Sequence, residues 1–182
     1  MAGVTYEVRT GGEAESRLDT FLPVYEEVFA EPPYCDGPKE VAEFIRVFHL
    51  QAKRPGFRAV LAREGADVVG FSFGYQLPRD SQWWSGLLEP MPEDFTRETN
   101  ERTFAIIDLA VRKPWRRQGI AAGLHTRILD GLPVERVTLT MRPDPEAAAA
   151  HAAYAAWGYR RIGASRPWDE APLYDAMVLD LR

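Results

Sequence analysis

Residues 108–121 read DLAVRKPWRRQGIA, and this stretch decides the fold. Its first residues end an almost continuous apolar run from Phe104 to Val111, which is typical of a strand buried on both faces. Apolar residues at positions 120, 124 and 128 then recur at helical spacing and predict a helix from Gly119 to Asp130. A buried strand therefore runs through a short basic turn into a helix, as in folds that mix strands and helices.

The basic turn predicts a phosphate site. The first turn of a helix has backbone N–H groups without partners and a positive dipole, and the small residues Gly119 and Ala121 leave this backbone open to a ligand. Four cations surround it in a chain whose net charge is −5, namely Arg112, Lys113, Arg116 and Arg117. The alternative is a solvated basic turn that caps an ordinary helix. The Walker and dinucleotide glycine motifs are both absent from this stretch.

The remaining pattern predicts a mixed α/β fold. Strands are predicted at Val4 to Arg9, Phe57 to Ala62, Val68 to Leu77, Val134 to Met141, Tyr159 to Ile162 and Leu173 to Leu181. Helices are predicted at Glu13 to Phe29, after Pro38, and at Pro145 to Trp157. The segment from Pro78 to Arg102 has no clean period, so it is either a long binding loop or a partly helical insertion over apolar surface.

Composition bounds the class of protein. The chain has 182 residues, of which 46% are hydrophobic and 27% charged, so we expect one folded domain over residues 1–182. The acidic balance argues against a nucleic-acid binder. A single cysteine and three scattered histidines predict no disulfide framework and no metal site. Without an apolar span or a signal peptide, we expect a soluble cytoplasmic protein that does not bind a membrane.

Two motifs resemble the GNAT superfamily of acyl-CoA-dependent N-acyltransferases. The pyrophosphate loop of that family has Arg or Gln, two free positions, Gly, one free position, then Gly or Ala, and Arg116, Gly119 and Ala121 fit it. The second landmark is a helix ending in Tyr, three residues, Gly and an aromatic, which matches Tyr154, Gly158 and Tyr159. Their order and separation also fit the family.

The resemblance implies a fold, a reaction and a cofactor site. The expected fold has a central mixed, mostly antiparallel sheet of about seven strands with helices on both faces, and relatives often form homodimers. The implied reaction moves an acetyl group from acetyl-CoA to an amine. The residues expected to bind acetyl-CoA are Leu109, Ala110, Val111, Arg116, Arg117, Gln118, Gly119, Ile120, Ala121 and Ala122. Ala147 stands where many relatives have a cofactor-binding asparagine.

The chemistry requires a base and an acid. Asp108 is the only charged residue of the predicted strand from Phe104 to Val111, where an unpaired carboxylate is unfavourable. It is therefore the candidate base, either directly or through a water that it holds; the alternatives are a structural ion pair to an arginine and a role in orienting a substrate ammonium. Tyr154 is the candidate acid that protonates the departing thiolate; the alternative is a core tyrosine. His151 either tunes Tyr154 or is a surface histidine, and Cys35 has no evident catalytic partner.

The predicted acceptor is a small-molecule amine. The residues expected to line its pocket are Glu27, Tyr34, Trp83 and Trp84, with Glu26 and Asp36 as weaker candidates that are otherwise solvated charges. If their segment is extended, Trp83 and Trp84 point in opposite directions. A protein N-terminus or lysine is the alternative acceptor. The alternatives from other classes are a non-catalytic acyl-CoA sensor and an unrelated phosphate-binding domain.

Overall fold

The computed structural model describes residues 3–182, and the contacts within the chain divide it into two compact units. The first unit holds residues 3–75 and 106–132, and the second holds residues 76–105 and 133–182. The strands follow one another in the order β1-β2-β3-β4-β5-β7-β6 in a seven-stranded sheet. The pairs β1/β2, β2/β3, β5/β7 and β6/β7 are antiparallel and β4/β5 is parallel, which confirms the predicted mixed, mostly antiparallel sheet.

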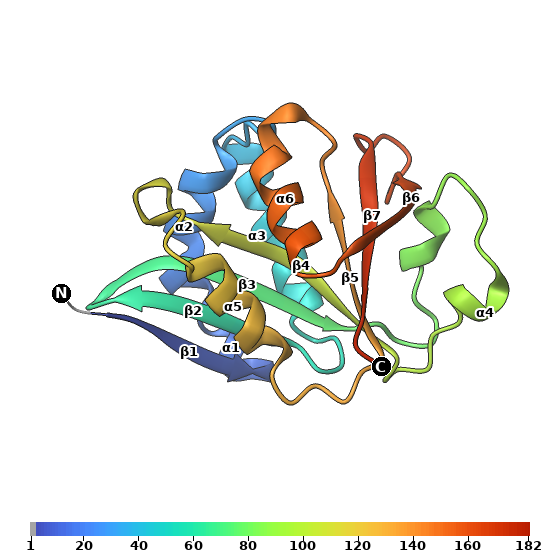
Figure 1. Cartoon of the computed structure of the whole chain (residues 1–182). Coiled ribbons are helices and arrows are strands. Elements are labelled where there is room, and N and C mark those ends of the chain that lie inside the picture. The colour runs from blue at the N-terminus through green and yellow to red at the C-terminus, as the bar shows by residue number, and fades with distance from the viewer. Residues whose placement is uncertain (1–2) are drawn as a thin grey trace. The chain divides into compact units, whose positions relative to one another are not determined.

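The first unit contains most of the helices (Figure 1). Its elements are β1 (Val4–Thr10), α1 (Gly11–Glu15), α2 (Leu18–Phe29), α3 (Pro38–Gln51), β2 (Arg58–Glu64), β3 (Asp67–Gln76), the end of β4 (Thr103–Val111), the short helix η2 (Lys113–Trp115) and α5 (Ile120–Leu129). The single helix predicted from Glu13 to Phe29 is wrong at its start. The Ser16 hydroxyl donates 2.8 Å to the Glu13 carbonyl, so a side chain replaces the next helical hydrogen bond.

An aromatic core lies between α2, α3 and strands β2 and β3. Phe21 of α2 stacks on Phe71 with ring centroids 4.5 Å apart, and Phe48 of α3 meets Phe73 edge-on at 5.0 Å. All four rings are fully buried. Figure 1 shows α5 on the opposite face of these strands, where its predicted inward residues Ile120, Leu124 and Ile128 are buried. Helices on both faces of these strands match the expectation.

The second unit contains strands β5, β6 and β7 and the start of β4. Its elements are η1 (Trp83–Gly86), α4 (Glu93–Thr96), the start of β4, β5 (Arg136–Met141), η3 (Pro145–Ala147), α6 (Ala148–Ala156), β6 (Arg160–Ser165) and β7 (Tyr174–Asp180). The β4/β5 ladder pairs Thr103–Ala105 with Arg136–Thr138 and ends there. The helix predicted at Pro145 begins as a 3-10 turn. Within residues 3–182, no helix is both long and apolar enough to cross a membrane.

The segment from Pro78 to Arg102 is a partly helical insertion held by a buried ion pair. Glu98 Oε1 accepts hydrogen bonds from Trp84 Nε1 at 2.8 Å and from the Arg136 guanidinium at 3.0 Å. The Arg136 guanidinium also lies over the Trp84 ring, 4.9 Å from its centroid. These contacts favour the partly helical insertion over the long binding loop, because buried side chains of the segment contact Arg136 of β5.

Substitution of Gly70 tests how closely β3 approaches β4 in the first unit. A Cβ at this position would lie 2.9 Å from the Ala110 carbonyl oxygen and 3.2 Å from a Leu124 methyl group. We expect Gly70→Ala to lower the free energy of unfolding by about 1–3 kcal/mol, because backbone must move to admit the methyl group. Denaturant unfolding measures this loss.

Gly12→Ala is the matched control. A Cβ on Gly12 of α1 would meet no described atom within 4 Å, so this variant should be as stable as the wild type or slightly more stable. Equal stability of Gly70→Ala and the wild type would contradict the close approach of the two strands.

Candidate active site

The turn between β4 and α5 has an unusual backbone. Arg117 and Gly119 both lie in the left-handed region, with φ of 65° and 80°. Gly119 precedes the first residue of α5, and a Cβ on it would meet no described atom within 4 Å. Since the first N–H groups of α5 have no partners earlier in the helix, the turn offers backbone donors beside the open space at Gly119, as an anion site requires.

Two of the four cations around this turn are held by acidic side chains. Arg112 Nε lies 3.0 Å from a Glu27 carboxylate oxygen. Arg116 meets both Glu31 carboxylate oxygens at 3.0 Å and donates from Nε to the Val111 carbonyl at 2.8 Å. Lys113 and Arg117 are exposed and form no ion pair with any residue from 3 to 182. Glu27, predicted to contact the acceptor, is thus engaged in holding the turn.

Asp108 is a carboxyl of the first unit whose pKa is strongly raised. Ile107, Asp108 and Leu109 are partly exposed, although the rest of β4 is buried, so the prediction of a strand buried throughout is wrong at these positions. Within residues 3–182, the Asp108 carboxyl has no ion pair, which speaks against the structural arginine pair. Burial, with a smaller contribution from the charge of Asp36, raises the pKa of Asp108 to about 8.

Tyr25 connects the carboxylate of Asp36 to the aromatic core. The Tyr25 hydroxyl donates to Asp36 Oδ2 at 2.8 Å, and its ring stacks on Phe44 with centroids 3.7 Å apart. Burial and the charge of Asp108 raise the pKa of Tyr25 well above its usual range. Burial also raises the pKa of Asp36, and the Tyr25 hydrogen bond opposes that shift. Tyr25 is not among the site residues predicted from the sequence. The signal that could have found it is a phenol on the buried face of a helix, because a buried phenol needs a polar partner.

The aromatic candidates for the acceptor pocket lie in different surroundings. Tyr34 is exposed and packs against Phe29 with ring centroids 4.8 Å apart. Trp83 and Trp84 lie in the 3-10 helix η1. Their segment is therefore not extended, so the expectation that the two side chains point in opposite directions does not apply. Trp83 is partly exposed, whereas Trp84 is buried and donates its indole N–H to Glu98.

Tyr154 lies buried on α6 in the second unit. Its ring contacts Trp157 and Tyr159 edge-on, with centroids 5.1 and 5.2 Å apart. His151, one turn earlier, is partly buried, and its Nε2 lies 2.8 Å from the Arg142 carbonyl oxygen, a contact in which the imidazole N–H donates. His151 therefore links α6 to Arg142, the residue after β5, a role that the sequence did not suggest.

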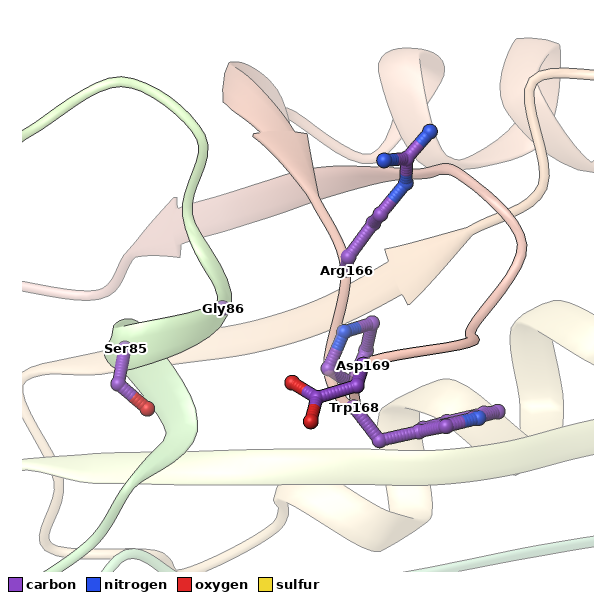
Figure 2. A pocket seen from close by; sticks show the side chains of 6 residues that line it. Ser85, Gly86, Arg166, Trp168 and Asp169 are labelled. Carbon is purple, nitrogen blue, oxygen red and sulfur yellow. The ribbon is translucent and has the colours of Figure 1, made fainter.

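The second unit also has a surface hollow of about 290 Å³. Figure 2 shows the Asp169 carboxylate pointing toward the segment of Ser85, while the Arg166 side chain points away. The lining residues are Ser85, Gly86, Arg166, Pro167, Trp168 and Asp169, and no predicted site residue is among them. Within residues 3–182, no group of three or more His, Cys, Asp or Glu side chains is arranged to hold a metal ion.

Asp108 generates a prediction about stability. The folded protein keeps the Asp108 proton up to a pH of about 8, whereas the unfolded chain releases it near the ordinary value of 3.8. The wild type therefore loses stability through this group as the pH rises between those values. Asp108→Asn removes that dependence, so from pH 5 to pH 9 its stability should gain on the wild type by on the order of 2 kcal/mol.

Thermal or denaturant unfolding across this pH range measures the difference. Asp67→Asn, which changes an exposed carboxylate of the same unit, is the control and should follow the wild type. A constant difference between Asp108→Asn and the wild type would show that the Asp108 carboxyl titrates normally.

Solved acetyltransferase structures share this fold. The acetyltransferase from Thermus thermophilus has a TM-score of 0.64 at 17% identity, with both chains covered in full. The ribosomal-protein-S18-alanine N-acetyltransferase from Escherichia coli has a TM-score of 0.63 at 16% identity, covering 98% of this chain and 94% of that one. A GNAT family acetyltransferase from Elizabethkingia anophelis with acetyl-CoA bound has a TM-score of 0.59 at 13% identity, with full coverage of both chains.

No curated protein sequence matches the chain. The family comparison is positive, however, and its match includes the basic turn, Asp108 and Tyr154. Residues 21–159 match the Acetyltransferase (GNAT) family, which is well over half of the chain, and the protein therefore belongs to this family of acetyltransferases.

Proposed function

We propose that the protein transfers the acetyl group of acetyl-CoA directly to the amine of a small cationic molecule. The observation that carries this proposal is Asp108, a partly buried carboxyl without an ion pair in residues 3–182 and with a pKa raised to about 8. The family match runs through both units, which supports the prediction that residues 1–182 act as one domain.

The turn before α5 fits the diphosphate of acetyl-CoA. Gly119 has open space where a Cβ would be, and the first N–H groups of α5 have no partners earlier in the helix. These groups would hold the diphosphate, assisted by the exposed Lys113 and Arg117. The backbone of Leu109, Ala110 and Val111 would pair with the pantetheine arm. Acetyl-CoA supplies the activated thioester.

Asp108 is proposed to take the proton of the acceptor. An ammonium has no lone pair, so its nitrogen must lose a proton before the new C–N bond forms. A carboxyl with a pKa of about 8 is a stronger base than an ordinary aspartate. The positive charge of a bound ammonium also favours the ionised form of Asp108, and Asp36 adds a second negative group. These two carboxyls are the reason for proposing a cationic acceptor.

Tyr154 is proposed to act on the leaving group. As the C–S bond breaks, the sulfur becomes a thiolate, and a phenol is protonated at neutral pH and can donate to it. Two protons leave the acceptor nitrogen while the acetyl carbon moves from sulfur to it. The first goes to Asp108 before the attack. The second, released as the adduct becomes the amide, passes to solvent, and solvent restores the proton that Tyr154 gives to sulfur. The buried ring, packed against Trp157 and Tyr159, restricts the orientation of this hydroxyl.

A protein N-terminus is the second candidate acceptor. The Escherichia coli enzyme of similar fold is named for acetylating the alanine of a ribosomal protein, and an α-amino group would need the same base and acid. Dimer formation and a cytoplasmic location stay predictions from the sequence.

An acceptor screen tests the proposed function. Release of free coenzyme A thiol is measured with acetyl-CoA and a panel of polyamines, amino sugars, amino-acid derivatives and peptides with free N-termini. We expect small cationic amines to react best, with kcat/KM rising up to a pH of about 8. Asp108→Asn should lose this rise and at least about 100-fold in rate, whereas Asp67→Asn should resemble the wild type.

The screen separates the alternatives. Preference for peptides would assign a protein substrate instead. Binding of acetyl-CoA in calorimetry without thiol release to any amine would indicate a sensor, and absence of binding would indicate an unrelated phosphate site.

Tyr154→Phe tests the proposed acid. We expect kcat to fall by about 10–100-fold because the thiolate leaves unprotonated, while the KM for acetyl-CoA changes little. Tyr159→Phe, in the same ring cluster, is the control for packing and should keep kcat within about twofold. An unchanged kcat in Tyr154→Phe would remove the acid assignment.

A further inference from the structure

Arg116, the basic residue of the cofactor motif, is hydrogen-bonded to other residues of the first unit. Its guanidinium forms two parallel hydrogen bonds of 3.0 Å with the Glu31 carboxylate, and its Nε donates 2.8 Å to the Val111 carbonyl at the end of β4. Three donors of the guanidinium are therefore used before any ligand arrives. This geometry suits an arginine that holds the protein backbone better than one reserved for a phosphate.

Glu31 is itself fixed by the backbone. Its N–H donates to the Val28 carbonyl at 3.2 Å, and its own carbonyl accepts hydrogen bonds from the N–H groups of Tyr34 and Cys35, both at 3.1 Å. The residue thus sits in a tight turn directly after α2. A carboxylate on such a turn offers Arg116 a partner at a defined position.

The loop that Arg116 anchors needs support. Next to it, Arg117 has a φ of 65°, a conformation that is unfavourable for any residue with a side chain. Two further side chains contact acidic residues. Trp115 Nε1 donates to Glu64 Oε2 at 2.9 Å, and Arg112 Nε lies 3.0 Å from a Glu27 carboxylate oxygen, an ion pair without a hydrogen bond. Of these contacts, only the Glu31–Arg116 contact is bidentate and immediately precedes the left-handed residue.

We propose that Glu31 is a positioning residue for acetyl-CoA: through Arg116 it holds the backbone N–H groups of residues 117–119 in the conformation that binds the diphosphate. This inference rests on the proposed cofactor function of the turn. The two side chains are each about a third exposed, with 36% for Arg116 and 35% for Glu31, so water weakens the pair. The bidentate geometry and the added Val111 contact offset part of that weakening.

Calorimetry with acetyl-CoA tests the proposal in a double-mutant cycle of Glu31→Gln, Arg116→Gln and the double variant. Glu31→Gln should weaken binding about fivefold, since a partly exposed bidentate pair contributes about 1 kcal/mol. The value of kcat at saturating acetyl-CoA should stay within about twofold. Because Glu31 acts through Arg116, the double variant should bind no more weakly than Arg116→Gln alone.

Glu43→Gln is the matched control. Glu43 and Arg46 also form a bidentate pair, on α3, with distances of 2.9 and 2.6 Å; this pair is more exposed and lies outside the turn. This variant should bind acetyl-CoA as the wild type does. Glu31→Asp keeps the charge and should lose less affinity than Glu31→Gln, a graded effect that general loss of folding would not produce.

The outcomes distinguish this inference from the function on which it rests. Wild-type affinity in Glu31→Gln, effects that multiply in the double variant, or a loss in kcat alone would overturn the positioning role. Gly119→Val reports on the turn itself, because a branched side chain would occupy the open corner. Lost affinity in Gly119→Val with normal Glu31→Gln would remove only the role of Glu31. Unchanged affinity in Gly119→Val would remove the turn as the cofactor site.

Discussion

The backbone conformation of the turn between β4 and α5 is the constraint on which the rest of the first unit depends. The chain leaves β4 and enters α5, which packs against β1 and β2. Between the two elements, Arg117 and Gly119 have left-handed backbone conformations. A glycine adopts this conformation freely, but an arginine does not. Acidic side chains from α2, the turn after it and β2 hold the loop, so carboxylates support a turn whose open side favours anions.

Charge is divided between two tasks. The arginines nearest to α2 are paired with Glu27 and Glu31, which leaves the backbone N–H groups together with Lys113 and Arg117 to attract an anion. Asp108, by contrast, has no cation beside it in residues 3–182, and its burial favours the protonated form. The same chain thus combines an anion site made mostly of backbone with a carboxyl suited to accept a proton.

Much of the fold follows from local pattern. The periodicity of Ile120, Leu124 and Ile128 located α5, because burial on one face of a helix leaves a regular signal, and runs of apolar residues located β2 and β3. The break between α1 and α2, where the Ser16 hydroxyl donates to the Glu13 carbonyl, left no such signal. The role of Trp84 was also hidden, because Glu98 and Arg136 come to it from distant positions in the chain.

The sequence by itself determined the family, the fold class and the identity of the turn, because motif spacing and apolar period are properties of neighbouring residues. Only the tertiary structure decided which charges are neutralised. Glu31 is 85 residues from Arg116, and Asp36 reaches Tyr25 across the end of α2. Electrostatic energy depends on distance in space and on burial, so the partners of Arg116 and the raised pKa of Asp108 appear only when the chain is folded.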